Sequence, residues 1–315
     1  MISDMKHIVL IGGGTGNFTL LRGLREYDVD LTSIVTVFDS GGSSGILRDE
    51  FGILPPGDVR KSLVALAGEE EHILRELFNF RFEGNGSLKG HSFGNLFLLA
   101  LTKITGSEAE AIKQAAKILK VKGKVLPVSL NHADVCAELD NGTVIVGETA
   151  IDLRGKGSSI ARLFLSSKSY LCEETRHAIE NADLIVIGPG DLYSSIIPNL
   201  LVSGMSEALR ASKAHKAYVC NLMTKPGESE GYTASRFASE IVRYANTTLN
   251  SIVCNTKIPA PEALELYAKK GQELVIPDPT TINWAERVIQ EDVIGEPDLV
   301  RHDPHKIARI LMKLV

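Results

Sequence analysis

The stretch "HIVLIGGGTGNFTLLRGL", residues 7–24, decides the fold. It opens with a short apolar run at residues 7–11, typical of a strand that is covered on both faces. Three glycines follow, and apolar residues then recur at helical spacing through residues 17–26. A second apolar run comes at residues 33–39. The first 40 residues therefore predict a βαβ unit, whose crossover should be right-handed.

A second stretch repeats this order later in the chain. The segment "ADLIVIGPGDLYSSIIPNLL", residues 182–201, combines an apolar run at 184–187, a Gly-Pro-Gly turn and a helical pattern. Because strands and helices alternate along the chain, the sequence predicts one α/β domain over residues 1–315. Its core would be a Rossmann-like, doubly wound, mostly parallel sheet with extra helices. Short β-like runs and a "DNG" hairpin signal predict a small antiparallel β insertion at residues 121–153.

The composition excludes several classes of protein. The formal net charge is −5, which argues against non-specific nucleic-acid binding because that needs concentrated Lys and Arg. The four cysteines form no CxxC pair, so a zinc knuckle is not expected. No apolar run approaches the ~20 residues that span a bilayer, and the N-terminus lacks the pattern of a signal peptide. We therefore expect a cytoplasmic protein without membrane insertion.

The glycines between the first strand and the first helix favour an anion site. Gly12, Gly13, Gly14 and Gly16 carry no Cβ atom that would block a phosphate, and a helix start offers free N–H groups. The strict G-x-G-x-x-G pattern is not met, because Asn17 holds its sixth position when the count starts at Gly12. A Walker A loop is absent too. The alternative is a tight turn that binds no ligand.

A second glycine loop, "DSGGSSG" at residues 39–45, follows the neighbouring strand. An acid at the place of Asp39 meets a ribose hydroxyl in dinucleotide-binding folds; alternatively, Asp39 only caps the loop. Ligands of open α/β sheets bind at the carboxyl ends of the strands, so two adjacent glycine loops suit a diphosphate. Residues 40–63 are rich in Gly, Ser and Pro, and we expect a long functional loop there.

Three cations lie in or just after this loop. Arg48, Arg60 and Lys61 can grip a phosphate, or they can pair with neighbouring acids on the surface. Asp58 follows "PPG" and is expected to be the N-cap of the next helix.

The turn after the strand at 184–187 is a third candidate loop. Gly188 and Gly190 free its backbone, and Asp191 can cap a helix, bind a divalent ion or accept from a ribose. Tyr193 can stack on a base. All of these residues should lie at the carboxyl edge of the sheet.

Two further pairs of polar residues are candidates. His91 and Asn95 are spaced (i, i+4) before an apolar helix and can hydrogen-bond a base or a sugar. The alternative is a histidine satisfied inside the core. Asn221 and Lys225 directly follow another predicted strand, and Lys225 is a candidate phosphate cation unless it is a solvated loop lysine.

Five motifs occur in one order over about residues 7–245. They read "IGGGTGNFTLLRGL", "TVFDSGGSSGILRDEFGILPPGDVRKSL", "GHSFGNL", "ADLIVIGPGDLYSSIIPNLL" and "CNLMTKPGESEGYT". Together they resemble the YvcK-type family of gluconeogenesis factors. That family is similar in turn to the CofD-type 2-phospholactate transferases of deazaflavin cofactor synthesis, which share the glycine loop and the "DSGG" loop.

The resemblance implies a Rossmann-like fold and a cytoplasmic protein linked to gluconeogenic growth and to cell shape or envelope synthesis. It also implies binding of UDP-sugars such as UDP-N-acetylglucosamine, without a settled catalytic activity. The resemblance carries over, residue by residue, to Gly13, Gly14, Thr15, Asn17, Asp39, Ser40, Gly41, Gly42, Gly188, Asp191 and Lys225.

The leading hypothesis is a binding protein whose ligand is a nucleotide sugar or a dinucleotide and whose occupancy a regulatory protein partner reads. The alternative is a Mg²⁺-dependent transferase, in which Asp39, Asp58 and Asp191 hold the ion and Arg48 or Lys225 stabilises developing charge. An NAD(P)-dependent oxidoreductase is disfavoured by the missing third glycine. Catalytic residues are not assigned, Mg²⁺ is the one cofactor considered, at Asp39 and Asp191, and a homo-oligomer is left open.

The complete set of residues predicted to bind the nucleotide is Gly12, Gly13, Gly14, Thr15, Gly16, Asn17, Asp39, Ser40, Gly41, Gly42, Arg48, Asp58, His91, Asn95, Gly188, Gly190, Asp191, Tyr193, Asn221 and Lys225.

Overall fold

The computed structural model describes residues 5–155, 157–278, 280–295 and 299–315. Its centre is a sheet of seven strands in the order β10-β9-β8-β7-β1-β2-β3, and every recorded pair in it is parallel. The strands are β1 (His7–Gly12), β2 (Asp30–Val35), β3 (Lys124–Pro127), β7 (Leu184–Ile187), β8 (His215–Val219), β9 (Leu249–Asn255) and β10 (Ala285–Glu291).

The strand order confirms the doubly wound fold. From β1 the chain proceeds outward through β2 to β3, and it then returns to place β7 on the other side of β1. From β7 it proceeds outward in the opposite direction to β10. The order reverses between β1 and β7, and open α/β sheets bind their ligands in the crevice at such a point.

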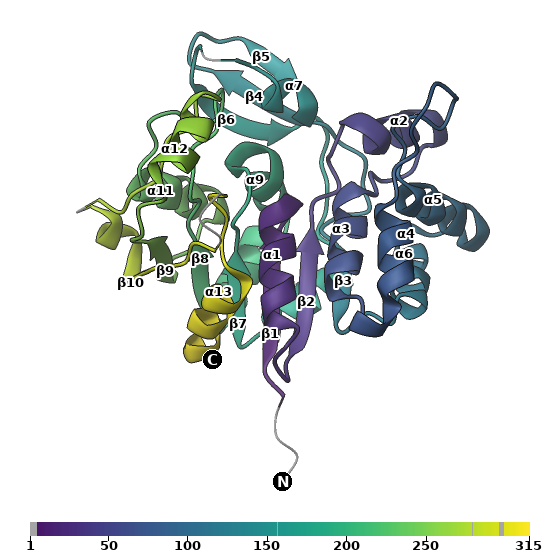
Figure 1. Ribbon diagram of the computed structural model, residues 1–315, viewed down its shortest axis with the longest axis horizontal. Helices are drawn as coiled ribbons and strands as arrows, with labels where there is room; N and C mark the ends of the chain where they lie inside the picture. Colours follow the sequence, from purple (N-terminus) through teal and green to yellow (C-terminus); the bar gives the residue numbers. More distant parts are fainter. Residues whose placement is uncertain (1–4, 156, 279, 296–298) are drawn as a thin grey trace.

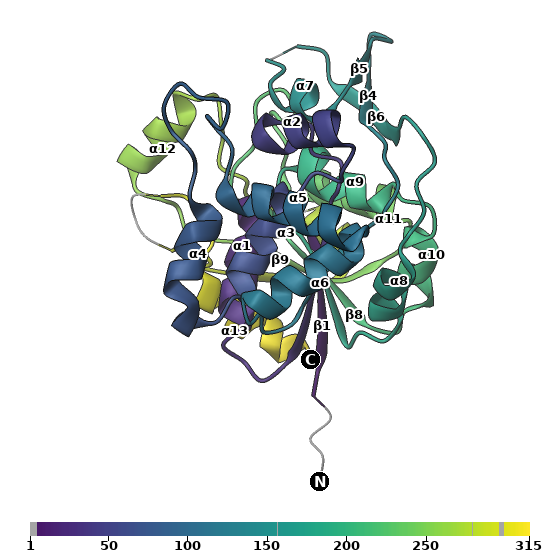
Figure 2. The same ribbon diagram turned by 90° about the vertical axis from the view of Figure 1, so that its right-hand side faces the viewer.

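Helices cover both faces of the sheet, as Figures 1 and 2 show. Along β1, Ile8 and Leu10 join one apolar core while Val9 and Ile11 join the other, as strand alternation requires. The first core includes residues from α1 (Gly14–Leu24), α3 (Gly57–Leu66), α5 (Phe93–Thr105), α6 (Glu108–Ile118), α12 (Pro261–Ala268) and α13 (Pro304–Leu311). The second includes residues from α8 (Glu173–Glu180), α9 (Ile197–Leu200), α10 (Met205–Ala211) and α11 (Ala234–Ala245).

A small antiparallel sheet, in the order β5-β4-β6, lies at the same end of the molecule as α2 (Gly42–Phe51) and α9 (Figure 1). Its strands are β4 (Val135–Leu139), β5 (Val144–Val146) and β6 (Ile160–Leu165), and α7 (Glu148–Asp152) follows β5. The "DNG" turn joins β4 to β5, as predicted. The bounds differ from the expected ones, since β3 belongs to the main sheet and β6 lies after residue 153.

Residues 40–63 are not a long loop, so that prediction is wrong. They form α2 and the start of α3, with only residues 52–56 between the two helices. Gly52, at φ +63°, ends α2 in the left-handed conformation, and Leu47 anchors it in the interior. Glycines and serines weaken the helical signal of a sequence, but tertiary packing overrides propensity here.

Two smaller predictions also fail. Asp58 lies inside the first turn of α3 rather than at its N-cap, which is Pro56. β2 ends at Val35, so Asp39 lies in the loop beyond it. No signal in the sequence indicates β10, because this half-exposed edge strand shows no clear hydrophobic period. One further helix, α4 (His72–Asn79), packs against α3 and α5. Within the described residues, no helix has the length and apolar character to span a membrane.

Candidate functional site

A cavity of about 400 Å³ lies at the carboxyl ends of β1 and β2, where the starts of three helices meet. Its walls come from α1, α2 and α3, from α7, which follows the small sheet's strand β5, and from the turn after β7. The cavity borders the place that the reversal of strand order between β1 and β7 predicts for a ligand, because the turn after β7 contributes Asp191 to its wall. Eight of the residues predicted from the sequence line it: Gly14, Thr15, Asp39, Gly41, Gly42, Asp58, Asn95 and Asp191.

The N-termini of α1 and α2 both open onto this cavity without a cap. Neither Gly13 nor Gly41, their N-cap residues, makes a side-chain cap, and neither helix has an acid in its first turn. The first N–H groups of a helix lack intrahelical partners and carry a partial positive charge. Gly42 has φ +46°, and a Cβ built on it would meet no atom within 4 Å. The backbone is therefore open to an anion at this point.

Asp39 and Asp58 form the floor between these helix starts. Asp39 Oδ1 accepts a 2.7 Å hydrogen bond from the Gly41 N–H. Burial raises the pKa of Asp39 despite that hydrogen bond, and the charge of Asp58 adds to the rise. Asp58 is itself buried and pairs with Lys61, whose Nζ lies 3.1 Å from Asp58 Oδ1. A Cβ on Gly13 would collide with the Asp58 carboxylate, which explains the glycine there.

Glu148, in α7, lines the same cavity and was missed by the sequence reasoning. Burial raises its pKa to about 7, and the charge of Asp39 contributes to this. The Thr149 N–H donates to Ser40 Oγ at 2.9 Å, which attaches α7 to the Asp39 loop. Only the fold brings residue 148 next to residue 40, and no local pattern in "GETAID" signals the contact.

Lys225 is not free to meet a phosphate, contrary to the expectation. Its Nζ lies 2.7 Å from Asp191 Oδ2 and 3.1 Å from Glu228 Oε1, and it also contacts the Asp152 carboxylate. Burial and the charge of Glu228 raise the pKa of Asp191. Three carboxylates therefore share the one ammonium group, which ties the loop after β8 to α7 and to the turn after β7.

A buried chain of hydrogen bonds supports the wall formed by α2, α3 and α5. His91 Nδ1 lies 3.1 Å from Ser43 Oγ, and Asn95 Nδ2 donates to the same hydroxyl at 3.0 Å. Arg60 Nε donates to Asn95 Oδ1 at 3.1 Å. Asn95 and Arg60 line the cavity, whereas His91 lies behind them. The alternative that His91 is a satisfied core histidine is thus the better description.

A second cavity, of about 360 Å³, lies on the other side of the start of α1. The predicted residues that line it are Thr15, Gly16, Gly190, Asp191, Asn221 and Lys225. Asn221 Nδ2 donates to the Gly190 carbonyl at 2.7 Å, which fixes the turn after β7. Thr15 and Asp191 line both cavities, so the α1 N-terminus stands between them.

The remaining predicted residues line neither cavity: Gly12, Gly13, Asn17, Ser40, Arg48, His91, Gly188 and Tyr193. Arg48 pairs with Asp49 and Asp134, each at 2.9 Å, and so cannot stabilise charge in the cavity. Tyr193 is 1% exposed and its hydroxyl lies 3.0 Å from that of Tyr232, so it has no free face for a base.

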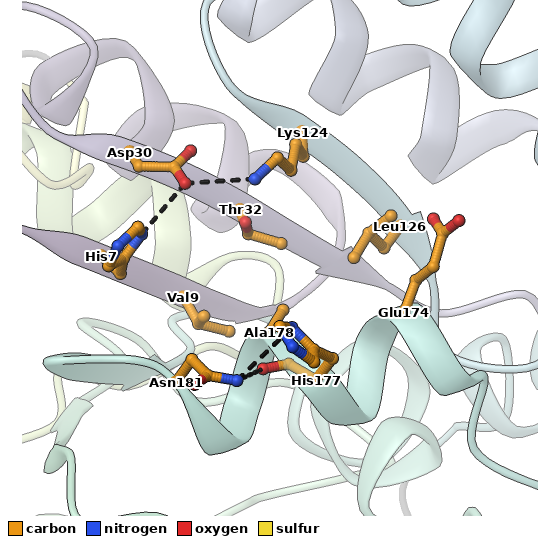
Figure 3. A pocket seen from close by; sticks show the side chains of 10 residues that line it. All are labelled: His7, Val9, Asp30, Thr32, Lys124, Leu126, Glu174, His177, Ala178 and Asn181. Carbon is orange, nitrogen blue, oxygen red and sulfur yellow. Dashed lines mark hydrogen bonds and ion pairs between the residues drawn. The ribbon is translucent and has the colours of Figure 1, made fainter.

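A cavity of about 450 Å³ lies at the opposite end of the sheet, against α8 (Figure 3). Its polar groups pair with one another, since Asp30 Oδ2 lies 3.0 Å from His7 Nδ1 and 3.1 Å from Lys124 Nζ. None of the predicted residues lines it, and the start of α8, which borders it through Glu174, carries acids in its first turn that would repel an anion. The cavity at the glycine loops is therefore the better candidate site.

Among the described residues, no three His, Cys, Asp or Glu side chains are placed to hold a metal ion. Mg²⁺ commonly binds through one or two carboxylates together with waters and substrate phosphates. Asp39 and Asp191, the residues considered for this ion, both line the cavity. They could serve such an ion only together with a phosphate ligand.

Comparisons with known proteins identify the family. The profile of the family described as 2-phospho-L-lactate transferase CofD matches residues 8–294. The protein named "Putative gluconeogenesis factor" from Thermotoga maritima is 44% identical over 98% of each chain. The "Gluconeogenesis factor" of Bacillus subtilis is 40% identical, again over 98% of each chain.

A crystal structure from Bacillus halodurans, of a protein described as a member of the UPF0052 family, has a TM-score of 0.93 to this chain. It is 42% identical and covers 98% of this chain and 99% of its own. The chain therefore belongs to the CofD family, among whose members it is similar over its full length to the gluconeogenesis factors.

Proposed function

We propose that the protein binds a nucleoside-diphosphate sugar, with UDP-N-acetylglucosamine as the leading example. The observation that carries this proposal is that α1 and α2 both begin, uncapped and without an acid in the first turn, at one cavity. A diphosphate offers one phosphate to each helix start, and Lys61 adds a cation at the same wall.

The carboxylates of the cavity favour a ligand that also carries hydroxyl groups. Asp39, Asp58, Glu148, Asp152 and Asp191 all line it, and an inorganic anion alone would face their repulsion. Ribose and hexose hydroxyls donate hydrogen bonds to such groups. The pKa of Glu148 is raised to about 7, so this group carries less charge than an ordinary carboxylate near neutral pH, and burial raises the pKa of Asp39 as well.

The two cavities on either side of Thr15 suit the two halves of such a ligand. With the diphosphate at the start of α1, the nucleoside would occupy one cavity and the sugar the other. The loops after β7 and β8 would close over the second half. The names of the relatives support a role in carbon metabolism. In the role that we propose, a cytoplasmic partner protein reads the occupancy and adjusts envelope synthesis.

Isothermal titration with UDP-N-acetylglucosamine tests this proposal. We expect saturable one-site binding, and no comparable heat from an equimolar mixture of UMP and N-acetylglucosamine, which lacks the diphosphate. The absence of heat with millimolar ligand would refute the proposal. Mass spectrometry of molecules that copurify with the protein is an independent check, with a nucleotide sugar as the expected species.

A transferase is the second candidate, because the CofD family profile covers most of the chain. The arrangement offers Glu148, whose pKa is raised to about 7, beside Asp39 as an acid–base group. Mg²⁺ would be held by Asp39 or Asp191 together with the phosphates of the substrate. Turnover of a nucleoside-diphosphate donor that Asp39→Asn abolishes, with the fold intact, would favour this candidate over binding alone.

A further inference from the structure

Arg60 is a buried cation without a carboxylate partner. Its side chain belongs to α3 and is 7% exposed. The guanidinium donates to three neutral oxygens: Asn95 Oδ1 at 3.1 Å, Asn79 Oδ1 at 2.7 Å and the Phe78 carbonyl at 3.3 Å. In the part of the chain that the structure describes, no carboxylate is recorded within 4 Å of it; Asp58 acts on it only from farther away.

Arg81 adds a second positive charge at the same wall. It follows α4, lines the cavity together with Arg60, and donates to the Gly90 carbonyl. Among the described residues it likewise forms no ion pair. Burial lowers the pKa of Arg60, and the charge of Arg81 lowers it further. The two guanidinium groups therefore repel each other, and among the described residues neither has a carboxylate within ion-pair distance.

This arrangement is costly unless an anion completes it. A buried charge is normally paired, because the loss of its hydration is not repaid by neutral acceptors alone. Guanidinium groups bind phosphate oxygens in a bidentate manner, and two of them can share one phosphate.

We propose that Arg60 and Arg81 form a site for the phosphate group of a phosphate monoester, separate from the diphosphate at the starts of α1 and α2. α3 lies between α1 and the helices α4 and α5 (Figure 1), and the guanidinium of Arg60 bonds to the α4 and α5 side. A nucleotide sugar would thus leave these two cations unused. The separation of the two sites rests on the proposed function, because it assumes that a diphosphate binds at the helix starts.

A phosphorylated second molecule beside a nucleotide sugar has a chemical consequence. A protein that only senses a nucleotide sugar needs one anion site, whereas a group-transfer reaction needs a donor and an acceptor in one cavity. The arginine pair would hold the phosphate of that acceptor, or of a second regulatory metabolite. Both cases share the same chemistry, a phosphate monoester against two guanidinium groups.

Titration with inorganic phosphate at constant ionic strength tests the site. We expect phosphate to bind both the free protein and the protein saturated with UDP-N-acetylglucosamine. Arg60→Lys should weaken phosphate binding by about tenfold, because it retains the charge but loses the bidentate geometry. Arg287→Lys, an equivalent change at an exposed position of β10, should leave phosphate binding unchanged.

Competition separates the possible results. If the nucleotide sugar displaces phosphate one for one, the arginines serve the diphosphate and the separate site is refuted, while the proposed function stands. If phosphate binds but UDP-N-acetylglucosamine does not, the arginine site stands and the proposed function fails. Should Arg60→Lys not fold, the exposed Arg81→Gln decides, because unchanged phosphate affinity in that variant would overturn the proposal.

Discussion

The two ends of α2 provide a matched pair of glycines that can test where the ligand binds. Gly42 begins the helix at the cavity with φ +46°, and Gly52 ends it with φ +63°. A Cβ built on either residue meets no atom within 4 Å. Alanine should therefore cost about the same at both positions, roughly 1–2 kcal/mol of left-handed strain. The unfolding temperatures of the two variants should fall by similar amounts.

Nucleotide-sugar binding should separate the two variants. The methyl group of Gly42→Ala enters the open space in front of the α2 N–H groups, where the proposal places a phosphate. The loss of one or two hydrogen bonds to a charged group costs about 1.5–3 kcal/mol. At 1.4 kcal/mol for each factor of ten, titration calorimetry should then show affinity reduced by about 10- to 150-fold. Gly52→Ala should bind like the wild type.

The reasoning fails if Gly42→Ala binds the nucleotide sugar as tightly as the wild type does. Equal losses of affinity in Gly42→Ala and Gly52→Ala would also contradict it, since they would show that backbone strain, and not the blocked helix start, lowers the affinity. Thermal unfolding of both proteins without ligand supplies the control, because it measures the strain by itself.

Three further perturbations test the charges and contacts around the cavity. The pKa of Glu148 is raised from 4.5 to about 7, so its stabilising contribution is complete below pH 4.5 and is lost as the pH rises through about 7. Relative to wild type, the free energy of unfolding of Glu148→Gln in urea should therefore rise by about 2 kcal/mol across this range. A difference that does not depend on pH would contradict the assignment. Lys225→Met leaves Asp191 and Glu228 without their cation and should lower the free energy of unfolding by about 3 kcal/mol, whereas a loss below about 1 kcal/mol would show that the cluster is solvated. Tyr193→Phe should cost about 1 kcal/mol of stability and leave ligand affinity unchanged, and weaker binding would show that the Tyr193 hydroxyl contributes to the ligand site.

The strands and the glycine loops could be predicted from local sequence because their signals are local. The apolar runs at β1 and β7 stop at glycines, and the carboxyl ends of parallel strands must share one edge of the sheet. This geometry brings Thr15, Asp39 and Asp191 to one cavity although the chain separates them widely. The sheet topology thus fixes the positions of the strand-end loops, and the alternation of strands and helices along the sequence reveals that topology.

The roles of individual side chains depended on partners that no local pattern shows. Lys225 follows a strand, as a phosphate cation should, but α7 and the turn after β7 surround it with carboxylates. Arg48 lies in the right segment, but Asp134, directly before β4 of the small sheet, pairs with it. Tyr193 is buried by packing that only the completed fold creates. A polar residue near a glycine loop therefore predicts proximity to a ligand better than it predicts contact.

The small sheet matters to the site through α7. Glu148 and Asp152 line the first cavity, Thr149 bonds to the Asp39 loop, and Lys225 joins Asp152 to the turn after β7. These contacts attach one short helix to segments from both sides of the strand-order reversal. A ligand that draws the Asp39 loop toward its diphosphate must act on the same hydrogen bond that holds α7, because Ser40 is part of that loop. Since α7 follows β5 after only one residue, we expect the small sheet to move when the proposed ligand binds.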